Sequence, residues 1–375
     1  MTLPVSIDRT ALVKLFVELA RIDSPSLNER AVADDVTRRF QALGFTVRED
    51  DAAAAVKGNT GNLICLPPHY RAGEPCIALC AHLDTVLPTK DLRPVVTEDR
   101  IATDGTTILG GDDRLGVSVI AYVSELMQKS GLKAVNFICV FTVAEELGMY
   151  GANHVDLSPY NVSAAYIFDS MKRPGIYIKD GSGCLIFTAT FKGKSAHAGV
   201  SPEEGVNAIA LAAAGMAGVK FGRIDPEMTS NIGKITGGGA TNVVPDEVVL
   251  DGEVRSFTPE KIYAEFDRIK KSFESAAAAG GGSVTFTSAM DFHPYVHDPS
   301  SPIVVEMERA LNAAGLTPKG IRYTGGSDAN SYNGKGTPAI NIGTGAQKPH
   351  SFEEFVLTED LIKSAEIALA LITSR

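Results

Sequence analysis

Two adjacent glutamates, Glu145 and Glu146, stand where an apolar run ends. The run covers residues 140–144 of the segment VFTVAEELGMYG, and a glycine-containing turn follows the pair. Neighbouring carboxylates repel each other, and burying either one is costly unless a proton or a cation compensates its charge. The pair is therefore explained by a site in which one glutamate binds a cation and the other stays free to act as a base.

A histidine and an aspartate share one face of another expected strand. In the segment CIALCAHLDTV, His82 and Asp84 occupy positions i and i+2, so the carboxylate can reach the imidazole ring. A carboxylate on the far nitrogen of a histidine is the usual support of a metal-bound imidazole. A surface pair at a strand end would have the same spacing, so this motif alone leaves both interpretations open.

More carboxylates and a second histidine occur at the ends of other expected elements. In ILGGDDRLG, N-capping explains Asp113, while the double glycine lets the backbone of Asp112 approach a site closely. Asp169 ends the strand of IFDS, and His350 lies in the glycine-rich segment GTGAQKPHSFEEF. Imidazole and carboxylate together suit zinc, manganese or cobalt. A carboxylate shared by two such metals is the basis of a two-metal hydrolase.

The elements that must position these side chains alternate between helix and strand over residues 8–180. The N-terminal segment indicates an amphipathic helix, and Ser26 with Glu29 has the capping-box spacing of a second helix that ends at Gly44. Short apolar runs between helical patterns indicate strands. This alternation predicts an α/β fold with a mostly parallel sheet and helices on both faces. Ligands of such sheets bind beyond the carboxyl ends of the strands.

The pattern changes near residue 182. From there the expected order is strand, helix, strand, strand, helix, strand, which is the order of a ferredoxin-like α+β sandwich. The helix–strand alternation resumes after residue 292. We therefore predict a catalytic metal-binding α/β domain made of residues 1–181 and 293–375, with an α+β domain of residues 182–292 inserted into it.

Composition excludes several classes of function. The 375 residues include 35 basic and 45 acidic side chains, for a formal charge of −10, without a basic block. This argues against a nucleic-acid or anionic-membrane partner. The chain has no apolar run long enough to span a membrane and no signal-peptide pattern at its start. The five cysteines form no CxxC motif and mostly lie in apolar runs, which predicts buried free thiols and a cytoplasmic location.

The chain resembles the di-zinc aminoacylase/carboxypeptidase superfamily, and within it tripeptidase T (peptidase T) and its shorter relatives. Seven segments occur in the order seen there: AHLDTV, DGTTILGGDDRLG, EELGMYGA, FDS, SAHAG, TNVVPDE and GGSDANSYNGKGTPAINIGTG. The resemblance extends over essentially the whole chain. HxD or EE alone would be common by chance, whereas seven motifs in one order are specific.

The resemblance implies a role for each matched residue of the α/β domain. His82 and Asp169 would bind one metal, Glu146 and His350 would bind the other, and Asp112 would bridge the two. Two divalent ions are expected per chain, with zinc as the first choice and cobalt or manganese as alternatives.

Two further residues of this domain would act in catalysis without bridging the metals. By the same resemblance, Asp84 would orient His82, and Glu145 would be the general base.

Two departures from the family pattern are visible. Arg114 stands where many members have lysine, which is also a cation. FDSMKRPG lacks the glycine that follows the aspartate in tripeptidase T, so a strict tripeptide preference is not implied.

The inserted domain of the family acts as a lid and a dimerisation surface, which implies a homodimer. His197 would reach the active site, often that of the partner subunit, and stabilise the oxyanion. Asn242 and Arg255 resemble residues that hold substrate carbonyl or carboxylate groups. Arg255 could equally be a salt-bridge partner at a strand end.

These expectations favour a metal-dependent exopeptidase, preferably an aminopeptidase acting on short peptides. The alternative is a carboxypeptidase or an N-acyl-amino-acid deacylase that uses the same centre. Family aminopeptidases and dipeptidases tend to have aspartate at the position of Asp169, where acylases and many carboxypeptidases have glutamate, so family analogy favours a peptidase. A catalytically inactive scaffold would be expected to lack the base or the bridging ligand, and this chain has both.

Overall fold

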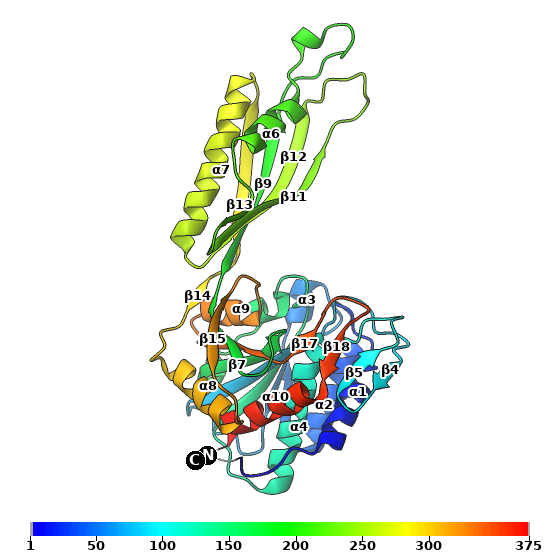
Figure 1. Ribbon diagram of the computed structural model, residues 1–375, viewed down its shortest axis with the longest axis vertical. Helices are drawn as coiled ribbons and strands as arrows, with labels where there is room; N and C mark the ends of the chain where they lie inside the picture. Colours follow the sequence, from blue (N-terminus) through cyan, green and yellow to red (C-terminus); the bar gives the residue numbers. More distant parts are fainter. Residues whose placement is uncertain (1–2, 374–375) are drawn as a thin grey trace. The chain divides into compact units, whose positions relative to one another are not determined.

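The computed structural model describes residues 3–373 and divides them into two units (Figure 1). The first unit contains the described residues up to Asp180, residues 297–323, and the described residues from Ser327 onward. The second unit contains Gly181–Val296 and Thr324–Gly326. The insertion thus extends past the predicted end at residue 292. Tyr295 explains part of the difference, because its ring lies against Gly181, where a Cβ atom would approach it to 2.3 Å.

The first unit is built on a mostly parallel sheet with the strand order β1-β2-β6-β3-β7-β16-β8, and β15 also pairs with β8. The strands are β1 (Thr46–Glu49), β2 (Leu63–Leu66), β3 (Cys76–His82), β6 (Phe137–Thr142), β7 (Val162–Ser170), β8 (Ile176–Gly181), β15 (Lys319–Tyr323) and β16 (Ala339–Gly343). Strands β6, β3, β7 and β16 run parallel to one another. Nearly every residue of β3 and β6 is buried, as expected for parallel strands covered on both faces.

Helices from both ends of the chain pack around this sheet. They are α1 (Arg9–Ala20), α2 (Arg30–Ala42), α3 (Ala52–Val56), α4 (Gly111–Ser130), α5 (Tyr150–His154), α8 (Pro302–Ala313), α9 (Asp328–Gly334) and α10 (Thr358–Ile372). Helix α4 packs on α1, α10 and β3, and together they contribute to one continuous hydrophobic core. The predicted α/β class is confirmed.

A small antiparallel sheet in the first unit joins distant parts of the chain. Its strand order is β17-β18-β5-β4. The strands are β4 (Pro94–Val96), β5 (Arg100–Thr103), β17 (Ala346–Gln347) and β18 (Phe355–Leu357). Strand β18 pairs with β5. This pairing brings the C-terminal segment that contains His350 next to the segment that leads into α4.

The predicted capping box of the second helix is wrong. The Ser26 hydroxyl donates to Asp84 Oδ2 at 2.7 Å instead of capping α2. Glu29 Oε1 accepts hydrogen bonds from the backbone N–H groups of Leu27 at 2.9 Å and Ala144 at 3.0 Å. Both side chains therefore bind residues that are distant in sequence, Asp84 and Ala144, and the local spacing of Ser26 and Glu29 could not predict this.

The second unit contains one antiparallel sheet, with the strand order β10-β11-β12-β9-β13, and two helices. Its elements are β9 (Gly183–Lys192), α6 (Ala208–Ala217), β10 (Gly222–Asp225), β11 (Met228–Gly237), β12 (Glu247–Ser256), α7 (Pro259–Ala279), β13 (Ser283–Phe292) and β14 (Tyr295–Val296). The predicted order is present, with β10 added before β11. Phenylalanine rings of β9 contact rings of α7 within the hydrophobic core of this unit: Phe187 contacts Phe266, and Phe191 contacts Phe273.

The cysteines and the helices of the structure bear on the predictions of free thiols and of no membrane-spanning segment. The five cysteines are buried, and none of them forms a disulfide within the described residues, which agrees with the predicted buried free thiols. Among residues 3–373, no helix combines the length and the apolar character needed to cross a lipid bilayer.

Candidate metal centre

His82 lies at the carboxyl end of β3, with its ring held from both sides. Its Nδ1 atom lies 3.0 Å from the carbonyl oxygen of Asp84 and 3.3 Å from Asp84 Oδ1, so Nε2 faces the other acids. Nε2 lies 3.0 Å from Asp112 Oδ1 and 3.7 Å from Asp169 Oδ1. Burial lowers the pKa of His82, but hydrogen bonds to Asp112, Asp169 and Asp84 outweigh it and raise the pKa well above its usual value.

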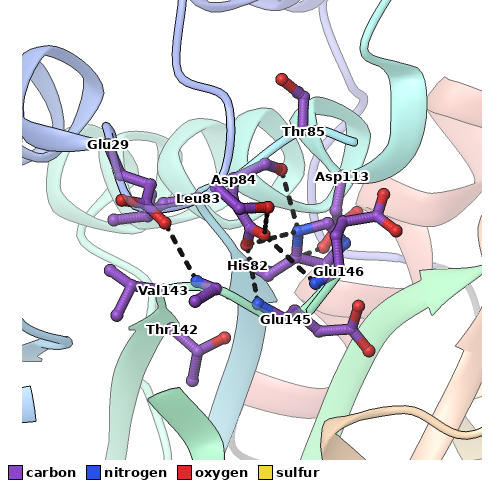
Figure 2. A network of polar contacts seen from close by, with 12 residues as sticks. Glu29, His82, Leu83, Asp84, Thr85, Asp113, Thr142, Val143, Glu145 and Glu146 are labelled. Carbon is purple, nitrogen blue, oxygen red and sulfur yellow. Dashed lines mark hydrogen bonds and ion pairs between the residues drawn. The ribbon is translucent and has the colours of Figure 1, made fainter. Parts of the chain in front are cut away.

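Asp84 also fixes the glutamate pair (Figure 2). Its Oδ1 atom accepts the backbone N–H of Glu145 at 3.0 Å, and Oδ2 accepts that of Glu146 at 3.1 Å. The side chain is fully buried. Burial raises the pKa of Asp84, but the hydrogen bond and charge of His82 more than offset this, so the pKa is lower than usual. One carboxylate thus positions a histidine and both glutamates.

The segment after β6 turns sharply and presents the two glutamate side chains. Ala144 has a φ of 51°, and its N–H is held by Glu29. The carbonyl oxygen of Glu145 accepts the N–H groups of Gly148 and Met149 at 2.8 and 2.7 Å, which closes the turn. Burial and then the charge of Asp169 raise the pKa of Glu145 well above its ordinary value.

Glu146 and His350 approach each other from distant parts of the chain. His350 Nε2 lies 3.0 Å from Glu146 Oε1 and 3.5 Å from Asp112 Oδ2. The nearby carboxylates of Asp112 and Glu146 raise the pKa of His350 to about 10. Glu146 Oε1 is nevertheless buried and accepts no hydrogen bond of normal geometry from the described residues. Two donor atoms that face each other in this way suit a shared cation.

Among residues 3–373, two groups of three side chains have their donor atoms within 4.8 Å of one another. They are His82, Asp112 and Glu146, and His82, Asp113 and Asp169. Asp113 Oδ2 accepts the N–H of His82 at 3.1 Å, and Oδ1 accepts that of Gly116 at 3.0 Å. The N-cap residue of α4 is Gly110 and makes no side-chain cap bond, whereas Asp113 lies inside α4 with non-helical backbone angles, and its bond to Gly116 follows the pattern of a cap there. Because both oxygens of Asp113 are engaged by the backbone, we assign this residue a structural role.

Sequence reasoning missed a buried carboxylate beside the cluster. Glu354 Oε2 accepts the N–H groups of Leu109 and Gly110 at 3.0 and 2.8 Å, and Oε1 accepts that of Asp112 at 3.1 Å. Burial and the charge of Asp112 raise the pKa of Glu354 to about 7. The available signal was a second glutamate pair, Glu353 and Glu354, in the segment HSFEEF.

Arg114 is fully buried and binds backbone oxygens near the end of β3. Its Nη1 donates to the carbonyl of Leu83 at 2.8 Å, and Nε donates to that of Leu19 at 3.2 Å. Nη2 contacts the hydroxyl of Ser24. A lysine has three donors on one nitrogen and lacks this forked geometry. The arginine at this position therefore joins the end of α1 to the strand that carries His82.

The three predicted substrate-contacting residues of the insertion lie in the second unit. His197 is exposed, and the N–H of Ala198 donates to the carbonyl of Asn242 at 2.9 Å, so these two segments are neighbours. The Arg255 guanidinium makes two hydrogen bonds of 2.9 Å to Glu253. The salt-bridge role that the sequence left open for Arg255 is therefore present. The catalytic and substrate roles of these residues stay predictions.

Known proteins resemble this chain in both sequence and fold. Residues 182–283 match the peptidase dimerisation domain of the M20 family. The chain is 34% identical to the uncharacterized protein YqjE of Bacillus subtilis (strain 168), over 98% of both proteins. It is 34% identical to the aminopeptidase PepT structure from Bacillus cereus ATCC 10987, with a TM-score of 0.91 and 98% of both chains covered. A tripeptidase structure from Staphylococcus aureus subsp. aureus Mu50 has 32% identity, a TM-score of 0.93 and the same coverage.

The α/β fold, the cluster of histidines and carboxylates, and these likenesses define a metallopeptidase. The chain belongs to the M20 peptidase family, where peptidase T is among its relatives. The predicted superfamily and the predicted class of enzyme are confirmed.

Proposed function

We propose that the protein is a two-metal aminopeptidase that releases N-terminal residues from short peptides. The proposal is carried by one observation: side chains from five separate segments of the first unit converge beside a glutamate that is fixed through its backbone. The converging residues are His82, Asp112, Glu146, Asp169 and His350, and the glutamate is Glu145.

The donor set suits two divalent cations. His82 and Asp169 would hold one, Glu146 and His350 would hold the other, and Asp112 faces both histidines and would bridge. Glu146 Oε1 is buried and has no hydrogen-bond donor among the described residues, which supports this assignment. Imidazole and carboxylate donors favour zinc, and cobalt and manganese are compatible with the same ligands.

When bound, the two cations would supply an acidified water and a Lewis acid for the scissile carbonyl. Glu145 would accept the proton of the attacking water at its carboxylate and deliver it to the leaving amine. Asp84 holds the N–H of Glu145, so the base is carried by a fixed backbone. His197, Asn242 and Arg255 would contribute oxyanion stabilisation and substrate binding.

The similar structures support the aminopeptidase polarity. One is that of the aminopeptidase PepT from Bacillus cereus and another is that of a tripeptidase from Staphylococcus aureus, and both cover 98% of this chain. By this likeness, the free N-terminus of a short peptide would be bound beside the cluster.

Assembly and location belong to the same proposal. The match of residues 182–283 to a peptidase dimerisation domain supports a homodimer formed through the second unit. The buried free thiols support a reducing, cytoplasmic environment.

Three forms of one tripeptide test the polarity. We expect the zinc- or cobalt-loaded protein to hydrolyse the free and C-amidated forms and to leave the N-acetylated form intact, because a free amine is recognised. Hydrolysis is measured by chromatography of the products. Cleavage of the free and acetylated forms, with the amide resistant, would instead support a carboxypeptidase or deacylase.

The His350→Ala variant tests the ligand set. We expect metal content after dialysis to fall from two ions per chain toward one, because His350 is a proposed ligand of only one position. His154→Ala is a matched control, since His154 is exposed on α5 and its ring bonds the carbonyl of Tyr150 at 2.7 Å. An unchanged stoichiometry in His350→Ala would show that His350 is not a ligand.

A further inference from the structure

One buried carboxylate joins two segments that carry proposed ligands. Glu354 lies in the loop that contains His350, just before β18. Its two oxygens accept three backbone N–H groups from the other segment, and one of these belongs to Asp112 itself. The hydrogen bond to Asp112 spans 242 residues of sequence, so it links parts of the chain that only the fold brings together.

Both ends of this link are fixed. Strand β18 follows Glu354 directly and is held in register on β5, with Phe355 opposite Ala102. On the other side, Gly111 allows the loop to approach the carboxylate. A Cβ atom at Gly111 would lie 3.0 Å from Val356 Cγ2 and 3.1 Å from Glu354 Oε1. The contact therefore has little room to adjust.

A purely structural role for Glu354 would be to satisfy N–H groups ahead of α4, whose first residues have no helical partner. That role predicts an effect on stability alone. Glu354 also connects two proposed metal ligands, because one of its hydrogen bonds is donated by the backbone N–H of Asp112 and Glu354 itself lies in the loop that contains His350. Any movement of Glu354 changes the separation of these two side chains, whose donor atoms lie 3.5 Å apart.

We propose that Glu354 is a positioning residue that sets the separation of Asp112 and His350 and thereby the affinity of the metal position that they share with Glu146. This inference rests on the proposed two-metal function. Groups that orient metal ligands typically contribute 10–100-fold to metal affinity or activity. Glu354→Gln keeps the size of the side chain but turns an –NH2 group toward backbone N–H donors, so at least one of the three hydrogen bonds is lost.

The test measures both zinc affinities of the full-length protein by chelator competition, together with thermal unfolding of the metal-free protein. In Glu354→Gln we expect one of the two dissociation constants to rise by about 10–100-fold and the other to rise by a smaller factor, because Asp112 is the proposed bridging ligand. The matched control is Glu265→Gln, because Glu265 is also buried but lies in the second unit and accepts hydrogen bonds from Arg268. The control should lower the melting temperature without altering either zinc affinity.

Gly111→Ala is a second test of the role of Glu354, because the added methyl group displaces the Glu354 carboxylate without changing its charge. This variant replaces Glu354→Gln if the latter does not fold. The same unequal loss of the two affinities is expected. Wild-type affinities at both positions in the folded variants would overturn the role of Glu354, even if their melting temperatures fell. The proposed function would fail by a different result: wild-type protein that binds fewer than two zinc ions, or His350→Ala that binds both normally.

Discussion

Glu145→Gln is expected to keep both metal ions and to lose turnover by about 10²–10⁴-fold, the usual contribution of a general base. The amide has the size of the carboxylate but cannot accept the proton of the attacking water. Metal content should be retained because the proposed ligands are other side chains, and because Asp84 binds the backbone N–H of residue 145, which the substitution leaves in place.

Metal analysis and peptide hydrolysis of the same preparation test this expectation. Glu125→Gln is a suitable control, since Glu125 lies on α4, is partly exposed and pairs with Lys129. Near-normal turnover in Glu145→Gln would remove the assignment of the base. Loss of one metal ion would show instead that Glu145 is a ligand.

Asp84→Asn should damage both the metal centre and the fold. Asp84 accepts the N–H groups of Glu145 and Glu146 and faces Nδ1 of His82, and an amide would direct an –NH2 group at one of these partners. We expect metal affinity to fall by about 10–100-fold. The free energy of unfolding of the metal-free protein should fall by about 1–3 kcal/mol, the cost of leaving a buried donor unsatisfied.

Chemical denaturation of the metal-free variant and chelator competition of the loaded variant separate these two effects. Asp180→Asn is the control, because Asp180 is another buried carboxylate of the first unit and is paired with Lys179. It should reduce stability and leave metal affinity intact. If Asp84→Asn behaved in the same way, Asp84 would have no role in positioning the ligands.

The positions of the cluster residues at strand and helix ends could be predicted because each stands beside a strong local pattern. Apolar runs locate the ends of β3, β6 and β7, and parallel strands bring those ends to one edge of the sheet. The residues missed are those whose partners are distant in sequence. Glu29 and Glu354 bind backbone N–H groups 115 and 242 residues away. A glutamate in such a role has no periodic pattern, because its partner is the backbone of a loop.

The capping-box error has the same origin. Ser26 and Glu29 have the correct spacing for a local motif, but Asp84 and the N–H of Ala144 compete for them successfully in the folded chain. For Arg255, the sequence left two roles open. Its position at a strand end suited both substrate binding and a salt bridge, and only the three-dimensional position of Glu253 showed that the salt bridge forms.

Strand β16 lies between β7 and β8 in the sheet, yet the ribosome makes it only after the whole second unit. Until then, β7 lacks its parallel neighbour on that side, and its backbone N–H and C=O groups have no strand partner there. His350 and Glu354 emerge later still. A nascent chain can therefore carry Glu145 and most of the proposed ligands without a complete centre, so the proposed metal centre can form only after residues 350–354 have been made.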